Sequence, residues 1–309
     1  MRTGTKQIIN GVKAAVAACV MLFAVNLPVL YAGTKQDGTS KTETEKIRVV
    51  TSIVPLSFFV KQIGGEHVDV TVMVPPGANP HTYDPTPGQM VALGSARMFV
   101  KAGSGIEFEL DWMKKFKALN PRMVVCDASR DYRSRTMQEH GGDEHLHGRI
   151  DPHFWLSPRN GILIANNIEH CLATLDPQHK SEYAENRRIL EVRLEELSGE
   201  IMQKLARMKN RAFMVFHPAW GYFADEFNLK QIAAEKEGKE LTPKTMQQVI
   251  GQAKKYDIKV VFVSPAFSSL QAETIAREIG GVIQPVDPLS GDYIDNLRQA
   301  AEAFVASMQ

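Results

Sequence analysis

Several features that mark common protein classes are rare or missing in this sequence. The formal net charge of the 309 residues is only +1, so the chain shows no basic surface of the kind that binds nucleic acid. After Leu30, no apolar run is long enough to span a bilayer. The sequence has no HExxH motif, and no serine or cysteine nucleophile motif with a partner histidine, which argues against a hydrolase. What remains is an ordinary globular composition, 44% hydrophobic and 23% charged, sufficient for two domains with separate cores.

The N-terminus is typical of an export signal. A basic start is followed by the apolar stretch Ala14–Leu30 and then by a polar tract. We predict a signal peptide over residues 1–32, a flexible leader over 33–46, and an exported, periplasmic protein. The alternative is a protein anchored on the outer face of the membrane, either by a retained apolar segment or by a lipid on Cys19.

The rest of the chain alternates between strand-like and helix-like segments, which predicts parallel sheets. We expect an N-terminal lobe over 47–177 and a C-terminal lobe over 209–309, each with a mostly parallel sheet flanked by helices. Between them, residues 178–208 contain no proline and carry apolar residues at steps of three or four, which predicts one long helix joining the two lobes. The fold class is therefore α/β.

Two cysteines, Cys126 and Cys171, lie within the predicted first lobe. They could pair in an oxidising compartment, but the sequence does not reveal the distance between them. Cys126 ends an apolar strand-like run and Cys171 lies in an apolar helix. These settings favour two buried free thiols.

Four residues occupy matching settings just beyond short apolar runs: His81, His153, His217 and Asp287. Each lies beside or near a proline, and ligands in open α/β sheets bind beyond the carboxyl ends of the strands. Taken singly, each has a plainer explanation, as a surface histidine, a packed core histidine, a helix-start residue or a turn residue. Together, three imidazoles and a carboxylate make a complete ligand set for one tetrahedral zinc. We predict a single metal site between the lobes.

The same motifs resemble a known family, the zinc-type (ZnuA-like) metal substrate-binding proteins of ABC importers. The resemblance extends from Ile47 to the C-terminus and depends on several motifs in the same order: Asn79-Pro80-His81, Asp151-Pro152-His153-Phe154-Trp155-Leu156, Phe216-His217-Pro218-Ala219-Trp220-Gly221, Gly238-Lys239-Glu240-Leu241-Thr242-Pro243 and Asp287-Pro288-Leu289. It implies that the four matching positions bind one metal between two lobes joined by a long helix. It also implies delivery of that metal to an ABC permease in the membrane, by a monomer without enzymatic activity.

The third ligand position distinguishes the branches of this family. Manganese-type members resemble the same pattern but have a glutamate where this chain has His217. Nitrogen-rich ligation suits zinc, whereas manganese prefers oxygen. A manganese or iron receptor of the same family, and a surface adhesin or metal buffer, stay open as alternatives. A secreted zinc hydrolase fits less well, because a catalytic zinc keeps one position open.

The chain departs from many zinc-type members in one region. They carry a long loop rich in histidine and acidic residues before the second ligand, whereas this chain has only the stretch 140–147. We predict that its three histidines, His140, His145 and His147, are at most an auxiliary site that collects zinc weakly. The alternative is a solvated loop that happens to contain histidines.

Overall fold

The computed structural model describes residues 45–137, 150–235 and 240–308, and all of them belong to one compact unit, Thr44–Gln309. The predicted signal peptide, nearly all of the predicted leader and the three auxiliary histidines lie outside the described residues. Within the described ranges, no helix combines the length and the apolar character that crossing a bilayer requires.

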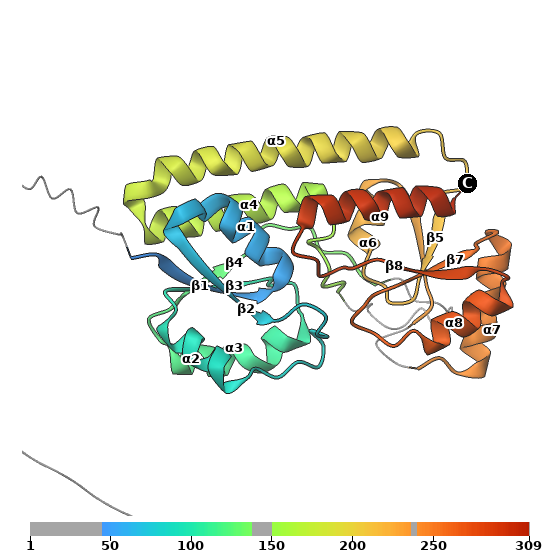
Figure 1. Ribbon diagram of the computed structural model, residues 1–309, viewed down its shortest axis with the longest axis horizontal. Coiled ribbons are helices and arrows are strands. Elements are labelled where there is room, and N and C mark those ends of the chain that lie inside the picture. Colours follow the sequence, from blue (N-terminus) through green and yellow to red (C-terminus); the bar gives the residue numbers. More distant parts are fainter. Residues whose placement is uncertain (1–44, 138–149, 236–239, 309) are drawn as a thin grey trace, which may run out of the picture. The chain divides into compact units, whose positions relative to one another are not determined.

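Two four-stranded parallel sheets, one in each lobe, confirm the predicted fold class (Figure 1). The first sheet has the order β2-β1-β3-β4 and the second the order β6-β5-β7-β8, so the same connection pattern occurs twice. Their strands are Ile47–Ile53 (β1), Val68–Val74 (β2), Met98–Lys101 (β3), Val124–Asp127 (β4), Ala212–Val215 (β5), Lys230–Ala233 (β6), Val260–Val263 (β7) and Val282–Pro285 (β8). Parallel sheets are covered on both faces, which explains why the central strands β3, β5 and β7 consist almost entirely of apolar residues.

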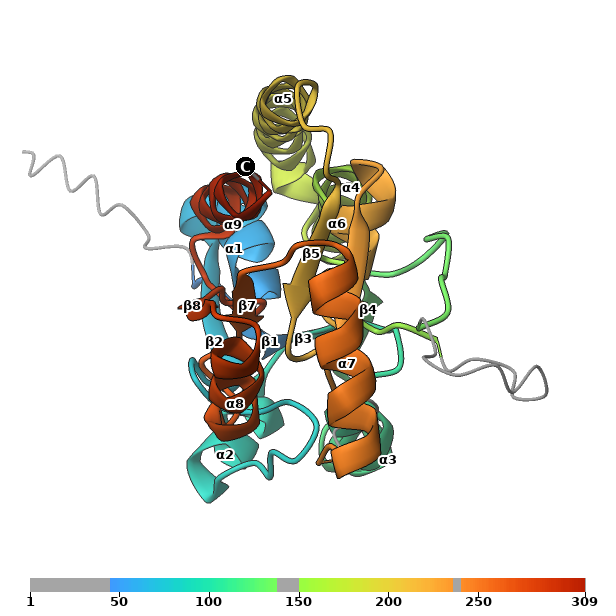
Figure 2. The same ribbon diagram turned by 90° about the vertical axis from the view of Figure 1, so that its right-hand side faces the viewer.

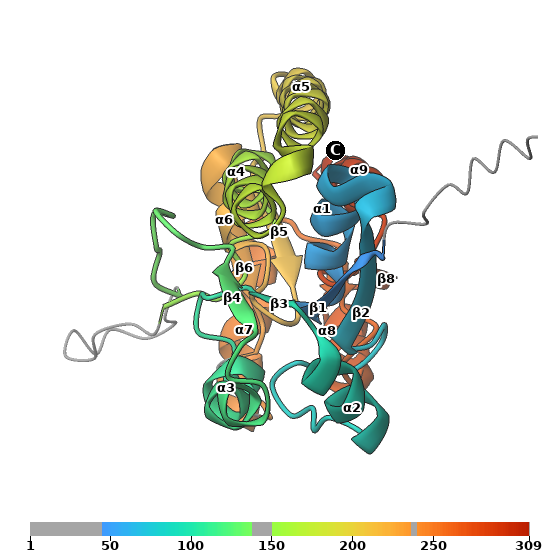
Figure 3. The ribbon, with the colours of Figure 1, turned by 90° about the vertical axis from the view of Figure 1, so that its left-hand side faces the viewer.

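Helices provide that cover. In Figure 3, α1 and α4 lie on one side of the first sheet, and α2 and α3 lie on the other. The helices are Val54–Gly64 (α1), Pro87–Ser95 (α2), Glu107–Leu119 (α3), Pro158–Leu175 (α4), Lys180–Leu205 (α5), Gly221–Glu226 (α6), Pro243–Lys255 (α7), Leu270–Glu278 (α8) and Tyr293–Ser307 (α9), with single 3-10 turns at Gly65–His67 (η1) and Pro177–His179 (η2). The short helix α6 was not expected from the sequence.

Three helices begin with the same local chemistry. Thr86, Ser157 and Thr242 each accept a backbone hydrogen bond from the third residue after them, and each is followed by proline. The hydroxyl accepts a hydrogen bond from a backbone N–H that has no partner within the helix. Proline has no backbone N–H, so no unpaired donor is left at the first position of the helix. These signals explain why α2, α4 and α7 begin at these prolines.

The long helix α5 lies outside the two lobes and runs along both. Its 26 residues span about 39 Å at the standard rise. Figures 1 and 2 show α5 on the far side of α4, α1 and α9 from the sheets, and it contacts all three of these helices. From Leu190 onward the buried residues lie at the predicted spacing of three or four: Leu190, Leu194, Leu197, Ile201 and Leu205. The helix is shorter at both ends than predicted.

One hydrophobic core continues from the first lobe into the second, and a smaller core lies between the second sheet and the helices α7 and α8. Tyr293, at the start of α9, bridges the lobes. Its ring lies 5.6 Å from that of Phe58 and 4.7 Å from that of Phe59, centre to centre, and its hydroxyl donates to the carbonyl of Trp155 at 2.5 Å. The lobes are therefore held together by packing as well as by α5.

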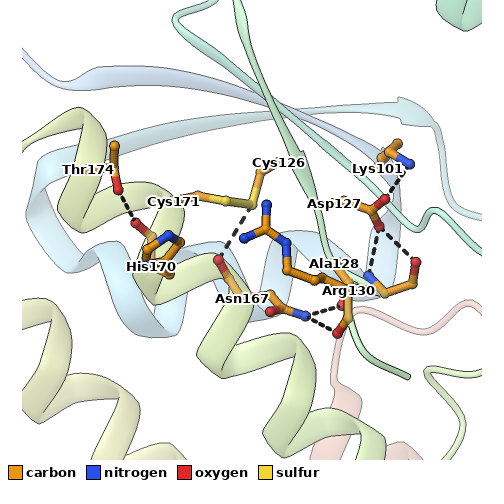
Figure 4. Close-up of a disulfide and its surroundings, with 10 residues drawn as sticks. Lys101, Cys126, Asp127, Ala128, Arg130, Asn167, His170, Cys171 and Thr174 are labelled. Atoms are coloured by element: carbon orange, nitrogen blue, oxygen red, sulfur yellow. Dashed lines mark hydrogen bonds and ion pairs between the residues drawn. A yellow bond between two sulfur atoms is a disulfide. The ribbon is translucent and has the colours of Figure 1, made fainter. Parts of the chain in front are cut away.

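The expectation of two free thiols was wrong, because Cys126 and Cys171 form a disulfide (Figure 4). Cys126 lies in β4 and Cys171 on α4, which packs against that strand and brings the two Cα atoms to 6.0 Å. This separation falls within the usual range for a disulfide. A buried strand and the helix that covers it are both apolar where they meet. The apolar surroundings of the two cysteines therefore indicate that they lie close together, which allows them to pair.

Candidate metal centre

Three of the four predicted ligands converge. His81, His153 and His217 each offer one nitrogen to a group in which these atoms lie within 4.8 Å of one another. The Nε2 atoms of His153 and His217 are 3.2 Å apart. Two nitrogens bound to one tetrahedral zinc would lie about 3.3 Å apart, given zinc–nitrogen bonds near 2.0–2.1 Å. The Nε2 atom of His81 is buried and finds no hydrogen-bond partner among the described residues.

Each of these rings has a carboxylate on its other nitrogen. Nδ1 of His81 lies 2.6 Å from Glu107, and Nδ1 of His153 lies 2.9 Å from Asp151. Nδ1 of His217 lies 3.3 Å from Glu235. An ionised carboxylate only accepts hydrogen bonds, so Nδ1 carries the hydrogen and Nε2 keeps its lone pair. Three lone pairs that face one another are unfavourable unless a cation lies between them.

The electrostatics of the site favour a neutral His217. Burial lowers the pKa of His217 to about 4, although the hydrogen bond to Glu235 opposes the shift. Burial would raise the pKa of Asp151, but the hydrogen bonds from His153 and the charge of Arg135 outweigh it and lower that pKa below its ordinary value. Metal ligation needs a neutral imidazole, as at His217. It is also favoured by an ionised carboxylate, as at Asp151, that accepts a hydrogen bond from a neighbouring ligand, His153.

The segment that carries His153 is firmly built. It directly precedes α4, and His153 is only 3% exposed. The hydroxyl of Ser104 donates to the carbonyl of Pro152 at 2.5 Å, and the indole nitrogen of Trp155 donates to the carbonyl of Pro288 at 2.8 Å. These contacts connect the segment to both lobes.

His217 follows β5, a central strand whose four residues are all buried. The ring of Phe267 stacks on that of His217 at 4.3 Å, nearly parallel, and covers one side of the site. A pocket of about 180 Å³ adjoins it and is lined by Phe216, Glu235, Glu240 and Phe267, among others.

His81 is held less tightly. It lies in the loop between β2, an edge strand, and α2. Its side chain is 20% exposed, and its backbone N–H donates to the side chain of Asn79 at 2.9 Å. The amide of Phe108 donates to the carbonyl of Pro80 at 3.3 Å, so the first turn of α3 supports the loop.

The fourth predicted ligand, Asp287, follows β8 but is not a member of the close group of nitrogens. One of its carboxylate oxygens accepts the N–H of Leu289 at 2.9 Å, and its carbonyl accepts from Asn296 at 2.7 Å. Burial raises the pKa of Asp287, against the effect of the Leu289 hydrogen bond. Its role as a ligand stays a prediction, and the auxiliary histidines lie outside the described residues.

Several residues of the site were not identified from the sequence. Asp151 stands in the Asp-Pro-His motif, where its closeness to His153 was a usable signal. Glu107, Glu235 and Phe267 lie 26, 18 and 50 positions from the histidines that they contact, and no sequence pattern points to them. Such partners depend on how the loops fold over one another.

Comparison with known proteins agrees with this geometry. The profile of the family described as "Zinc-uptake complex component A periplasmic" matches residues 49–307. The chain is 28% identical to the "High-affinity zinc uptake system protein ZnuA" of Bacillus subtilis over 95% of this chain and 96% of that protein. A solved structure described as "Crystal structure of ZnuA" superimposes with a TM-score of 0.81 and 37% sequence identity. The match covers 86% of this chain and 100% of the chain in that structure.

A further relative is longer than this chain. The "Zinc-binding protein AdcA" of Streptococcus pyogenes is 27% identical over 80% of this chain but only 51% of its own length. The chain thus spans about half of that relative.

Proposed function

Because the chain belongs to the ZnuA family of zinc-uptake components, we propose that it captures a single zinc ion on His81, His153 and His217, with Asp287 as the fourth ligand, and delivers it to an ABC permease. The observation that carries the proposal is the convergence of one nitrogen from each of the three imidazoles, whose Nδ1 atoms lie against carboxylates. Zinc is the cargo here, so the site must both hold it and let it go.

The donor set supports zinc over manganese. Three imidazole nitrogens suit zinc, whereas manganese prefers carboxylate, carbonyl and water ligands. His217 is the position that decides between them. A secreted zinc hydrolase is disfavoured, because the chain belongs to a family of solute-binding components and four protein ligands would close the zinc shell.

Release fits a local rearrangement better than a wide opening of the lobes. The helix α5 contacts helices of both lobes, and Tyr293 packs on Phe58 and Phe59 across them. Separating the lobes would expose this packing. The loop of His81 is the candidate for such a rearrangement, because it follows an edge strand and the His81 side chain is 20% exposed.

The test is metal binding by the purified protein, followed by thermal unfolding with zinc or manganese at neutral pH. We expect one zinc per chain by elemental analysis, and a larger rise in unfolding temperature with zinc than with manganese. Binding to the folded state alone stabilises it by about 2.7 kcal/mol at a hundredfold excess over the dissociation constant. A larger shift with manganese, or no shift with either ion, would overturn the proposal.

The loop at 140–147 is proposed only as an auxiliary site. Its deletion should leave the single high-affinity zinc in place and remove at most a weaker second equivalent. Complete loss of zinc binding in the deletion variant would show that this loop supplies a primary ligand.

A further inference from the structure

One arginine outside the ligand set connects a metal ligand with the second lobe. We propose that Arg135 is a positioning residue for zinc: it holds one oxygen of Asp151 and so fixes the other on His153, and it ties this arrangement to α6 through Asp225. The inference rests on the proposed zinc site. It adds a residue that governs how firmly that site keeps its cargo.

The contacts form a continuous chain from the ligand to the surface. Oδ1 of Asp151 lies 2.9 Å from Nδ1 of His153, and Oδ2 of the same carboxylate accepts from Nη1 of Arg135 at 2.6 Å. The Nε atom of Arg135 donates to Asp225 at 2.8 Å. Side-chain exposure rises along this chain, from 0% for Asp151 to 12% for Arg135 and 59% for Asp225. Asp225 lies on α6, which follows the strand and turn that carry His217.

The backbone also holds Arg135 in place. Its N–H donates to the hydroxyl of Tyr222 on α6 at 3.1 Å, and its carbonyl accepts the N–H of Asp151 at 2.9 Å. The Tyr222 hydroxyl donates in turn to the carbonyl of Asp151 at 3.1 Å. Arg135 is therefore fixed by both its main chain and its side chain.

Gly221 shows how closely this arrangement is fitted. A Cβ atom at Gly221 would lie 1.7 Å from Nη1 of Arg135 and 2.6 Å from Oδ2 of Asp151. Any side chain at this position would therefore push the guanidinium away from the carboxylate. Gly221 starts α6 without a positive φ, so alanine is compatible with its backbone, and its nearest clashes would be with Arg135 and Asp151.

The residues farthest from the metal ligand in this series of contacts, Arg135 and Asp225, are accessible from the protein surface. Arg135 and Asp225 both line a surface cavity of about 710 Å³, whereas Asp151 is fully buried behind them. A guanidinium presents several donors in a fixed plane and can serve two carboxylates at once, which a lysine ammonium does less well. A contact that displaces Arg135 in this cavity would therefore loosen Asp151 and, through it, His153.

The experiment compares the zinc affinity and zinc dissociation rate of the parent with those of Arg135→Gln, Arg135→Lys and Gly221→Ala. Loss of a residue that orients a metal-binding histidine typically costs about 10–100-fold in affinity. We expect losses in this range for Arg135→Gln and Gly221→Ala, mostly through faster dissociation, and a smaller loss for Arg135→Lys. Asp225→Asn should change affinity about threefold or less, because an exposed ion pair contributes little.

Arg298→Gln is the matched control. Arg298 also bridges two carboxylates, Glu200 at 2.9 Å and Asp295 at 2.5 Å, but on the helices α5 and α9. It should leave zinc affinity unchanged. A cobalt(II)-loaded sample adds a readout of ligand geometry: its visible spectrum should change in Arg135→Gln and Gly221→Ala and stay the same in Arg298→Gln.

Gly221→Ala keeps every charge, so it tests the inference even if Arg135→Gln fails to fold. A parent protein without zinc binding would defeat the proposed function itself. A parent that binds zinc while Gly221→Ala and Arg135→Lys keep its affinity, dissociation rate and cobalt spectrum would overturn the role of Arg135 alone.

Discussion

Two groups of histidines paired with carboxylates lie at opposite ends of α4, and only one of them converges on a point. His153 precedes the start of this 18-residue helix, which is about 27 Å long, and Asp176 follows its end. At the second end, the rings of His67 and His179 stack 3.7 Å apart. Nε2 of His67 lies 2.8 Å from Glu182, and Nδ1 of His179 lies 2.6 Å from Asp176.

The difference lies in where the ring nitrogens point. An imidazole lone pair lies in the plane of its ring, so two stacked rings direct their lone pairs along nearly parallel planes that do not meet. The rings of the metal centre are steeply inclined to one another, with 81° between His153 and His217 and 63° between His81 and His217. Identical residue types therefore form a group that could hold a metal ion at one end of α4, and a contact between η1 and the start of α5 at the other.

The largest expected effect separates these two groups. His153→Ala or His217→Ala should weaken zinc binding by more than about 100-fold, since loss of a ligand should exceed the 10–100-fold cost of losing a residue behind one. The three histidines are not members of the hydrophobic cores that hold the sheets and α5, so we expect the variants to keep the circular dichroism of the parent. Isothermal titration with zinc measures the loss.

His179→Ala is the control for this comparison, because it removes an imidazole that also pairs with a carboxylate. Zinc affinity should be unchanged in this variant. Unchanged affinity in His153→Ala and His217→Ala, or a loss of equal size in His179→Ala, would show that the site is assigned to the wrong histidines.

Within the metal centre, His81→Ala should cost less than the other two ligand deletions, by about tenfold. The His81 side chain is 20% exposed and its loop follows an edge strand, so water can take its place, and zinc accepts water as a fourth ligand. Competition with a zinc-binding dye ranks the three variants. A loss with His81→Ala that matches His153→Ala would mean that the loop is as rigid as the buried segment.

Much of the fold and of the candidate site can be predicted from the sequence, and the parts that cannot be predicted have a physical reason in common. The alternation of strands and helices, the long helix and the choice of the three candidate histidines depend on local patterns, which the sequence contains directly. The disulfide and the residues Glu107, Glu235 and Arg135 depend on which segments the fold places side by side. Residue type alone does not distinguish the pair His67 and His179 from the three candidate ligand histidines. It differs from them by ring orientation, which only the packing of η1 against α5 determines.

Removing the disulfide should affect stability and leave the metal centre alone. Cys126 and Cys171 are 45 positions apart, and closing a loop of this size typically stabilises a protein by about 2–4 kcal/mol. Cys171 lies near the second end of α4, thirteen residues beyond its start, or about 20 Å along the helix. Urea unfolding of Cys126→Ala/Cys171→Ala should show this loss, with zinc affinity unchanged. A large loss of zinc affinity would indicate that the disulfide shapes the site.

The smallest effect concerns Asp176, whose carboxylate accepts from the hydroxyl of Tyr183 at 2.6 Å and pairs with His179. Burial would raise its pKa, but these hydrogen bonds and the charges of His179 and His67 outweigh it, so the pKa of Asp176 falls below the ordinary 3.8. A carboxyl group with a lowered pKa in the folded protein stabilises the fold above the ordinary value. That contribution is lost as pH falls through the lowered pKa.

Asp176→Asn should therefore reduce the free energy of unfolding by about 1–2 kcal/mol at pH 7, in the range for hydrogen bonds to charged groups. The difference from the parent should shrink as pH falls below about 4, because the parent then loses the same charge. Urea unfolding of the zinc-free proteins at several pH values measures it, with Glu185→Gln as the control, because Glu185 is exposed and lies on the same helix as Tyr183. Zinc affinity at neutral pH should be equal in all three proteins. A penalty that stays constant down to about pH 3 would mean that the substitution disturbs packing rather than removing a charge, and a change in zinc affinity would mean that the two ends of α4 are not independent.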